Sequence, residues 1–115
     1  MSPIELNPES IIDFFAGDRE LAKEALAQAL EGAEENYAEL QKAVSQLDLD
    51  GCERRAHSLK GNLAYFQMDW TSSLCFEIEE AARQQDQSAL NEHNQRLNSQ
   101  FDSLLNELKK FVDEL

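Results

Sequence analysis

The stretch LAQALEGAEENYAELQKAVSQL, residues 26–47, decides the fold because its apolar residues recur at alternating steps of four and three. An α-helix completes a turn in about 3.6 residues, so this spacing places the apolar side chains on one side of a helix. The stretch therefore predicts a long amphipathic helix, which we place over about residues 18–46. The apolar stripe consists of Leu26, Leu30, Ala33, Tyr37, Leu40, Val44 and Leu47.

A short helix is expected before this long one. Asn7 is a good capping residue, and Pro8 suits the first helical position because its missing N–H would have no partner there anyway. The short helix is expected over about residues 8–16, with Gly17 and Asp18 separating it from the next. Its apolar residues are more numerous than a narrow buried stripe needs.

Three further apolar stripes follow residue 47. The first begins near Asp48 or Asp50, either of which can cap a helix, and Asp69 is the expected cap of the next. The polar stretch QQDQ then separates the last two stripes. The three expected helices cover about residues 50–67, 69–84 and 87–114.

Four long helices with short connections favour an all-α, antiparallel up-down-up-down four-helix bundle, because a short loop returns the chain beside the helix it has just left. The helix at residues 8–16 is then a short extra N-terminal element that caps one end. A chain of 115 residues can bury one core. We therefore treat residues 1–115 as a single domain with one site.

The composition excludes several classes of function. Ten Lys and Arg residues against 23 Asp and Glu residues give a net charge of −13, whose field would repel a nucleic acid. No apolar run approaches the roughly 20 residues of a membrane span, so no direct membrane contact is expected. Cys52 and Cys75 occupy apolar helical positions rather than metal-ligand spacing, which favours a reducing, cytoplasmic setting.

The third expected helix carries a histidine on its polar side. His57 lies roughly 140° from the centre of the apolar stripe, with Arg54 and Lys60 one turn away on the same side. A neutral imidazole is nucleophilic near neutral pH, and the two cations could balance a phosphoryl group bound to it. Gly61 and Ala64 leave the adjoining surface bare, so that a partner's backbone could approach. This pattern indicates phosphoryl chemistry on His57.

Two segments, AHSLKGNLAYF at residues 56–66 and LCFEIEEAAR at residues 74–83, resemble the histidine-containing phosphotransfer (Hpt) domains of bacterial and fungal phosphorelays. The resemblance covers nearly the whole chain. It rests on a His-x-x-Lys-Gly motif, an apolar stretch, and a following helix with Cys, then Glu or Gln, then a basic residue. It implies a helical bundle that carries a phosphoryl group on its histidine.

The resemblance also implies roles for individual residues. His57 corresponds to the phosphorylated histidine, Lys60 to the residue that neutralises the phosphoryl oxygens, and Gly61 to the small residue that admits the partner. Glu79 corresponds to a residue that hydrogen-bonds the imidazole from the neighbouring helix, and Arg83 to a basic position near the site. A carboxylate accepting from Nδ1–H would leave Nε2 free to attack, although a surface Glu79–Arg83 ion pair explains their spacing equally well.

The sequence departs from the family pattern at three positions near the motif. Asn62 and Leu63 replace the commoner small residues after the glycine, and Gln67 stands where a glycine is frequent. None of these residues replaces the phosphoryl acceptor. They bear instead on the turn between the third and fourth expected helices and on the choice of partner, because these positions border the docking face.

The expected function is that of a phosphorelay intermediate. His57 would take a phosphoryl group from the aspartyl phosphate of a receiver domain and pass it to another receiver, in a free protein or in a hybrid histidine kinase. The chain has no ATP-binding motif, so it is not expected to be an enzyme or to need a cofactor, and Mg²⁺ is expected on the receiver. We expect a monomer. The expected docking residues are Arg54, Gly61, Ala64, Arg83, Ile11 and Phe15.

Two other classes of function stay open from the residues alone. An exposed histidine beside a lysine is usually part of a solvated face, and the chain would then be a structural or adaptor bundle with an incidental His57. A phosphatase or metal hydrolase is the other class. Its metal site is not expected, because His57 and His93 fall on different helices without the spacing of a zinc site.

Overall fold

A computed structural model describes residues 6–115 and folds them into α-helices, with no strand in that range. The expectation of an all-α fold class is confirmed. The described helices are α1 (Pro8–Asp13), α2 (Arg19–Ser45), α3 (Leu49–Ala64), α4 (Asp69–Arg83) and α5 (Gln87–Asp113).

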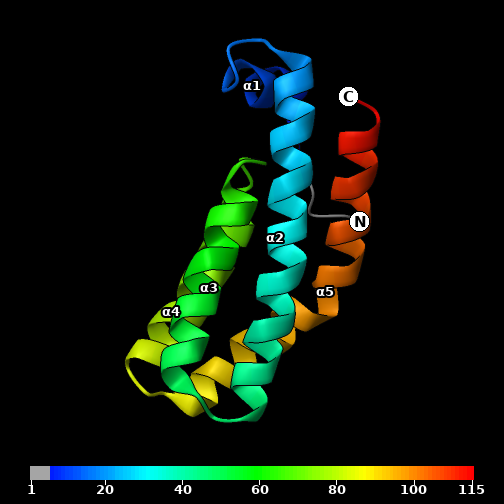
Figure 1. Ribbon diagram of the computed structural model, residues 1–115. Helices are drawn as coiled ribbons and strands as arrows, with labels where there is room; N and C mark the ends of the chain where they lie inside the picture. Colours follow the sequence, from blue (N-terminus) through cyan, green and yellow to red (C-terminus); the bar gives the residue numbers. More distant parts are fainter. Residues whose placement is uncertain (1–5) are drawn as a thin grey trace.

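The four long helices form an antiparallel up-down-up-down bundle (Figure 1). α3 contacts both α2 and α4, and α5 closes the bundle by contacts with α4 and α2. α2 and α5 have 27 residues each, whereas α3 has 16 and α4 has 15. The two longer helices therefore extend past the shorter pair at one end, and α1 lies at that end of the bundle (Figure 1).

Four of the five described helices begin with an Asn or Asp whose side chain accepts a bond from an N–H of the first turn, which has no partner inside the helix. The expectation that Asp69 caps α4 is wrong. Met68 occupies the cap position without a side-chain bond, and Asp69 is the first helical residue. The capping oxygens belong to Asn7, Asp18, Asp48 and Asp86, at 3.1, 3.0, 3.0 and 3.0 Å from their donors.

Two helices end three residues earlier than the sequence pattern predicts. α1 ends at Asp13 and α3 at Ala64, because the chain then enters the left-handed region, with φ of 57° at Ala16 and 60° at Gln67. A residue other than glycine pays roughly 1 kcal/mol or more in this conformation. Gln67 has a compensating bond, since Ser10 Oγ donates to its Oε1 at 2.6 Å. The residue that replaces a frequent glycine therefore fastens α1 to the α3–α4 turn.

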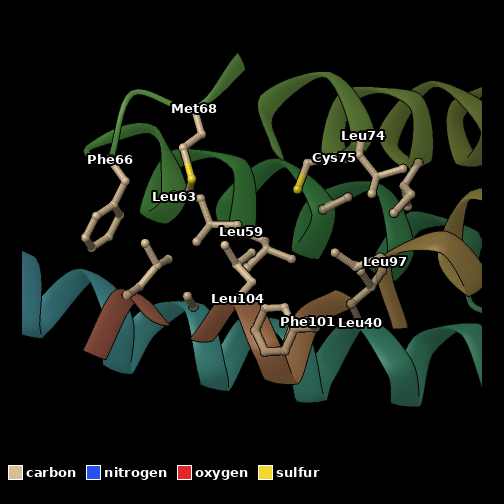
Figure 2. Close-up of a cluster of buried hydrophobic side chains, with 14 of the residues drawn as sticks. Leu40, Leu59, Leu63, Phe66, Met68, Leu74, Cys75, Leu97, Phe101 and Leu104 are labelled. Carbon is tan, nitrogen blue, oxygen red and sulfur yellow. The ribbon is translucent and has the colours of Figure 1, made fainter. Parts of the chain in front are cut away.

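The core runs along the bundle and takes one apolar stripe from each long helix. Figure 2 shows Leu59 and Leu63 of α3 facing Phe101 and Leu104 of α5. Full burial of a side chain of this size contributes about 1.5–3 kcal/mol, so these contacts dominate the stability of the bundle. The stripe predicted for α3 is at most 1% exposed throughout; it consists of Cys52, Ala56, Leu59, Leu63 and Phe66.

Two positions differ from the predicted stripes. Leu47 is 62% exposed, because the chain has already left α2 and has a φ of 56° there. Asn94 of α5 is buried in the core face although it is polar. It exchanges two bonds with Gln41 of α2, at 2.8 and 2.9 Å, so both amides are satisfied. This pair fixes the register of α2 against α5, and an apolar pattern has no signal for it.

Two glycines of α3 differ in their surroundings. A Cβ at Gly51 would overlap the capping carboxylate of Asp48 and lie 3.3 Å from Ala43 Cβ, whereas a Cβ at Gly61 would meet nothing within 4 Å. Alanine adds about 1 kcal/mol of helix propensity at either site, but at Gly51 it also displaces a cap worth about 1 kcal/mol.

We therefore expect Gly61→Ala to raise the free energy of unfolding, and Gly51→Ala to be at least about 1 kcal/mol less stable than Gly61→Ala. Urea denaturation followed by circular dichroism measures both variants against the wild type. Equal stability of the two variants would contradict the packing described for α3.

Candidate functional site

α3 presents His57 to solvent because its buried stripe lies on the opposite side. Ala56 and Leu59 have no exposed surface, whereas 67% of the His57 side chain is exposed. Ser58 and Gly61 are also exposed on this side of the helix. The expectation that the imidazole faces outward is therefore confirmed.

A buried carboxylate from α4 lies against this imidazole. The side chain of Glu79 is 8% exposed and contacts three basic groups. His57 Nδ1 lies 3.2 Å from Oε2, Lys60 Nζ donates to Oε1 at 2.9 Å, and Arg83 Nη2 donates to Oε2 at 3.0 Å. Glu79 is thus both a partner of the imidazole and the ion-pair partner of Arg83, so the two interpretations of the sequence hold together.

These partners keep Glu79 ionised. Burial alone would raise the pKa of the carboxyl group, but the hydrogen bond and charge of Lys60, followed by those of His57, outweigh it. The pKa of Glu79 consequently lies below its ordinary value of 4.5. An ionised carboxylate only accepts, so the imidazole bonds to it through Nδ1–H. In the neutral imidazole, the other ring nitrogen, Nε2, is then left with a free lone pair.

Arg83 is held by three carboxylates. Its Nε donates to Glu53 Oε2 at 2.9 Å, its Nη2 donates to Glu79, and its Nη1 pairs with Glu80. The bond to Glu53 is the largest of the effects that raise the pKa of Arg83 above its ordinary value. Arg83 therefore neutralises the buried Glu79 instead of projecting freely toward solvent.

An apolar groove begins one turn along α3 from His57. It is lined by Phe14, Gly61, Ala64, Tyr65 and Gln67. Phe14 is 66% exposed, and its ring meets that of Tyr65 edge to face with centroids 5.9 Å apart. Exposed aromatic surface beside polar groups is typical of protein interfaces. The bare surface that the sequence predicts at Gly61 and Ala64 is part of this groove.

The apolar residues of α1 and of the turn after it divide between core and surface, but not as the sequence pattern predicts. Ile11 has no exposed surface, so its assignment as a docking residue is wrong: its side chain packs in the core. Phe15 is half-buried and stacks on Tyr65 at 6.2 Å. Phe14 is exposed but is not among the docking residues predicted from the sequence. It follows the last residue of α1, where helical periodicity no longer predicts direction.

The remaining reactive side chains do not form a second site of this kind. His93 is 20% exposed and lies 3.3 Å from Glu77, at the edge of the α4–α5 contact. Burial raises the pKa of Cys52 to about 11 and that of Cys75 to about 12, so both thiols stay protonated. Within residues 6–115, no His, Cys, Asp and Glu side chains gather into a cluster suited to a metal ion. In the same range no helix is long and apolar enough to span a membrane.

Comparison with known proteins agrees with this geometry. The family model of the Hpt domain matches residues 24–113. The chain belongs to the Hpt domain family. The crystal structure of the HPT domain from the Hpt sensor hybrid histidine kinase of Shewanella is similar, with a TM-score of 0.80 and 25% identity over 96% of this chain and 95% of that one. A comparison with curated proteins gives no match.

Membership of the family confirms the resemblance found in the sequence. Hpt domains are phosphotransfer modules without a kinase site of their own, so this Hpt domain has a phosphotransfer role in a phosphorelay, with receiver domains as its class of partner. The site supplies the two features that such a role needs, an exposed imidazole and an open surface next to it.

We expect Glu79→Gln to lower the free energy of unfolding at neutral pH by about 2 kcal/mol, because the amide cannot balance Lys60 and Arg83. The pKa of Glu79 in the folded protein lies below its ordinary value of 4.5, which applies to the unfolded chain. The stability advantage of the wild type over Glu79→Gln is therefore fully present at pH values above the unfolded pKa. This stability advantage decreases as the pH falls through the lower pKa that Glu79 has in the folded protein. Urea denaturation across this pH range measures this advantage, with Glu77→Gln as the control, because Glu77 is an ion-paired glutamate of α4 whose side chain is 40% exposed. An advantage that stays constant to the lowest pH would contradict the assignment.

Proposed function

We propose that this Hpt domain is a phosphorelay intermediate that accepts a phosphoryl group on His57 Nε2 from the aspartyl phosphate of a receiver domain and passes it to another receiver. It does so as a free protein or as part of a hybrid histidine kinase. The observation that carries the proposal is the 3.2 Å contact between Nδ1 of an exposed imidazole and the buried, ionised Glu79. This contact holds the tautomer in which Nε2 is the nucleophile.

In the proposed transfer, Nε2 forms a bond to phosphorus while the P–O bond to the receiver's aspartate breaks. The aspartate leaves as a carboxylate with the bonding pair, and the ring keeps its proton on Nδ1. Glu79 then stabilises the positive charge that the imidazole acquires. The Mg²⁺ of the reaction would be held by the receiver, and this chain would supply the acceptor without a cofactor of its own.

The proposed docking surface is the aromatic groove together with the exposed face of α3. Phe14 and Tyr65 offer apolar area for contact. Gly61 and Ala64 are small residues, so the surface next to His57 is sterically open to a partner. A partner that buries the two rings can therefore bring its own acidic site to the imidazole. An apolar patch bordered by polar and charged groups is the usual arrangement of a protein interface.

Labelled phosphate should be transferred to wild-type protein from a phosphorylated receiver of the same organism. The label should be labile in acid and stable in base, as a phosphoramidate is, and absent from His57→Gln. His93→Gln is the matched control, because His93 also lies beside a glutamate. It should be labelled like the wild type. An adaptor bundle would bind the receiver in both variants without acquiring label, and that outcome would refute the proposed function.

We expect Phe14→Ala to raise the Kd for a receiver by about tenfold, since removing a central aromatic side chain commonly costs more than 1 kcal/mol. Leu47→Ala is the control, because Leu47 is 62% exposed against 66% for Phe14. It lies in the turn between α2 and α3, and this turn is at the opposite end of the bundle from α1 (Figure 1). Calorimetric titration measures both variants. Equal affinities for the two variants would place docking elsewhere on the molecule.

A further inference from the structure

The cations around His57 differ in what already binds them. Lys60 donates to the buried Glu79 at 2.9 Å, and its Nζ lies 5.1 Å from the centre of the Phe76 ring. Its side chain is only 26% exposed. If Lys60 turned away to a phosphoryl group, the carboxylate of Glu79 would lose the partner that most lowers its pKa. Removing a cation from a buried carboxylate is costly, because less of its charge is then compensated.

Arg83 is committed in the same way, because its guanidinium contacts Glu53, Glu79 and Glu80. A phosphoryl group would have to compete with three carboxylates for these donors. Two of the cations near the imidazole therefore serve the carboxylates of the protein before any phosphoryl group arrives.

Arg54 is different. It lies one turn before His57 on the exposed side of α3, and its guanidinium has no ion pair or hydrogen bond within residues 6–115. A depression of about 540 Å³ beside His57 is lined by Arg54 and Arg55 and by Glu53 and Glu79, the carboxylates that Arg83 binds, but by neither Lys60 nor Arg83. Arg55 donates to Asn36 at 3.1 Å, so Arg54 is the uncommitted cation of the depression.

The charge of the product makes this difference important. A phosphoryl group adds a charge of about −1.5 to −2 and strong acceptor oxygens beside His57. A guanidinium can bind two such oxygens at once, and Arg54 can do so without breaking an existing ion pair. Arg54 gains the bond at the smallest cost of the three cations.

We propose that Arg54 binds the phosphoryl oxygens in the depression beside His57, and that Lys60 is a positioning residue that acts on the imidazole through Glu79. This division of roles rests on the proposed function and differs from the role that the family resemblance gives to Lys60. It assigns the phosphoryl subsite to a residue that precedes the histidine.

Phosphoramidate tests the division without any receiver. Nε2 attacks its phosphorus, the P–N bond breaks and ammonia leaves, so the rate reports the site of this chain alone. The full chain is compared as wild type, Arg54→Gln, Arg54→Lys and Lys60→Gln, with Arg96→Gln as a control for an exposed arginine. Nitrogen-15 shifts of His57 in the unphosphorylated protein report the tautomer, and circular dichroism verifies that each variant is folded.

We expect Arg54→Gln to lower the rate of phosphorylation about tenfold, with partial rescue in Arg54→Lys and no change in the tautomer. Lys60→Gln should change the tautomer signals, and Arg96→Gln should change neither readout. The inference is overturned if Arg54→Gln reacts within twofold of the wild type, or if Lys60→Gln slows the reaction while the tautomer stays the same. Failure of labelled receivers to modify a wild type that reacts with phosphoramidate would instead count against the proposed function.

Discussion

One buried negative charge governs the arrangement of α3 and α4. A carboxylate as buried as Glu79 stays ionised only if cations lie close to it, because removing a charge from water costs free energy. Lys60 and His57 reach it from α3, and Arg83 reaches it from α4. The same interaction therefore fixes the position of one helix against the other and the proton of the imidazole. The local contact between α3 and α4 and the chemistry of the site therefore share one interaction.

The unequal helix lengths have a second consequence for the surface. Because α2 and α5 run past α3 and α4, the end of the bundle has room for α1, which buries Ile11, and for the turn after it, which exposes Phe14. The bond between Ser10 and Gln67 holds this segment to the α3–α4 turn. An aromatic surface is thereby placed one turn from His57, although its residues come from two distant parts of the chain.

Much of the fold follows from the sequence, and the exceptions have definite causes. The stripe of α3 and the outward direction of His57 follow from helical periodicity alone. Asn94 has no signal in an apolar pattern, because its burial depends on an amide partner on another helix. Ile11 and Phe14 could not be assigned, since α1 is too short for periodicity to predict which residues in it and just after it face the core.

By itself the sequence determined the helical class, the polar face that carries His57, and the membership of the Hpt family, because these depend on spacing within one helix and on a local motif. Only the tertiary structure decided which cations are free. In the sequence, nothing distinguishes the charges of Lys60, Arg83 and Arg54. In the structure, the buried carboxylate of Glu79 on α4 binds Lys60 and Arg83, whereas Arg54 is open to solvent. Interactions between helices depend on their packing, which no local pattern records.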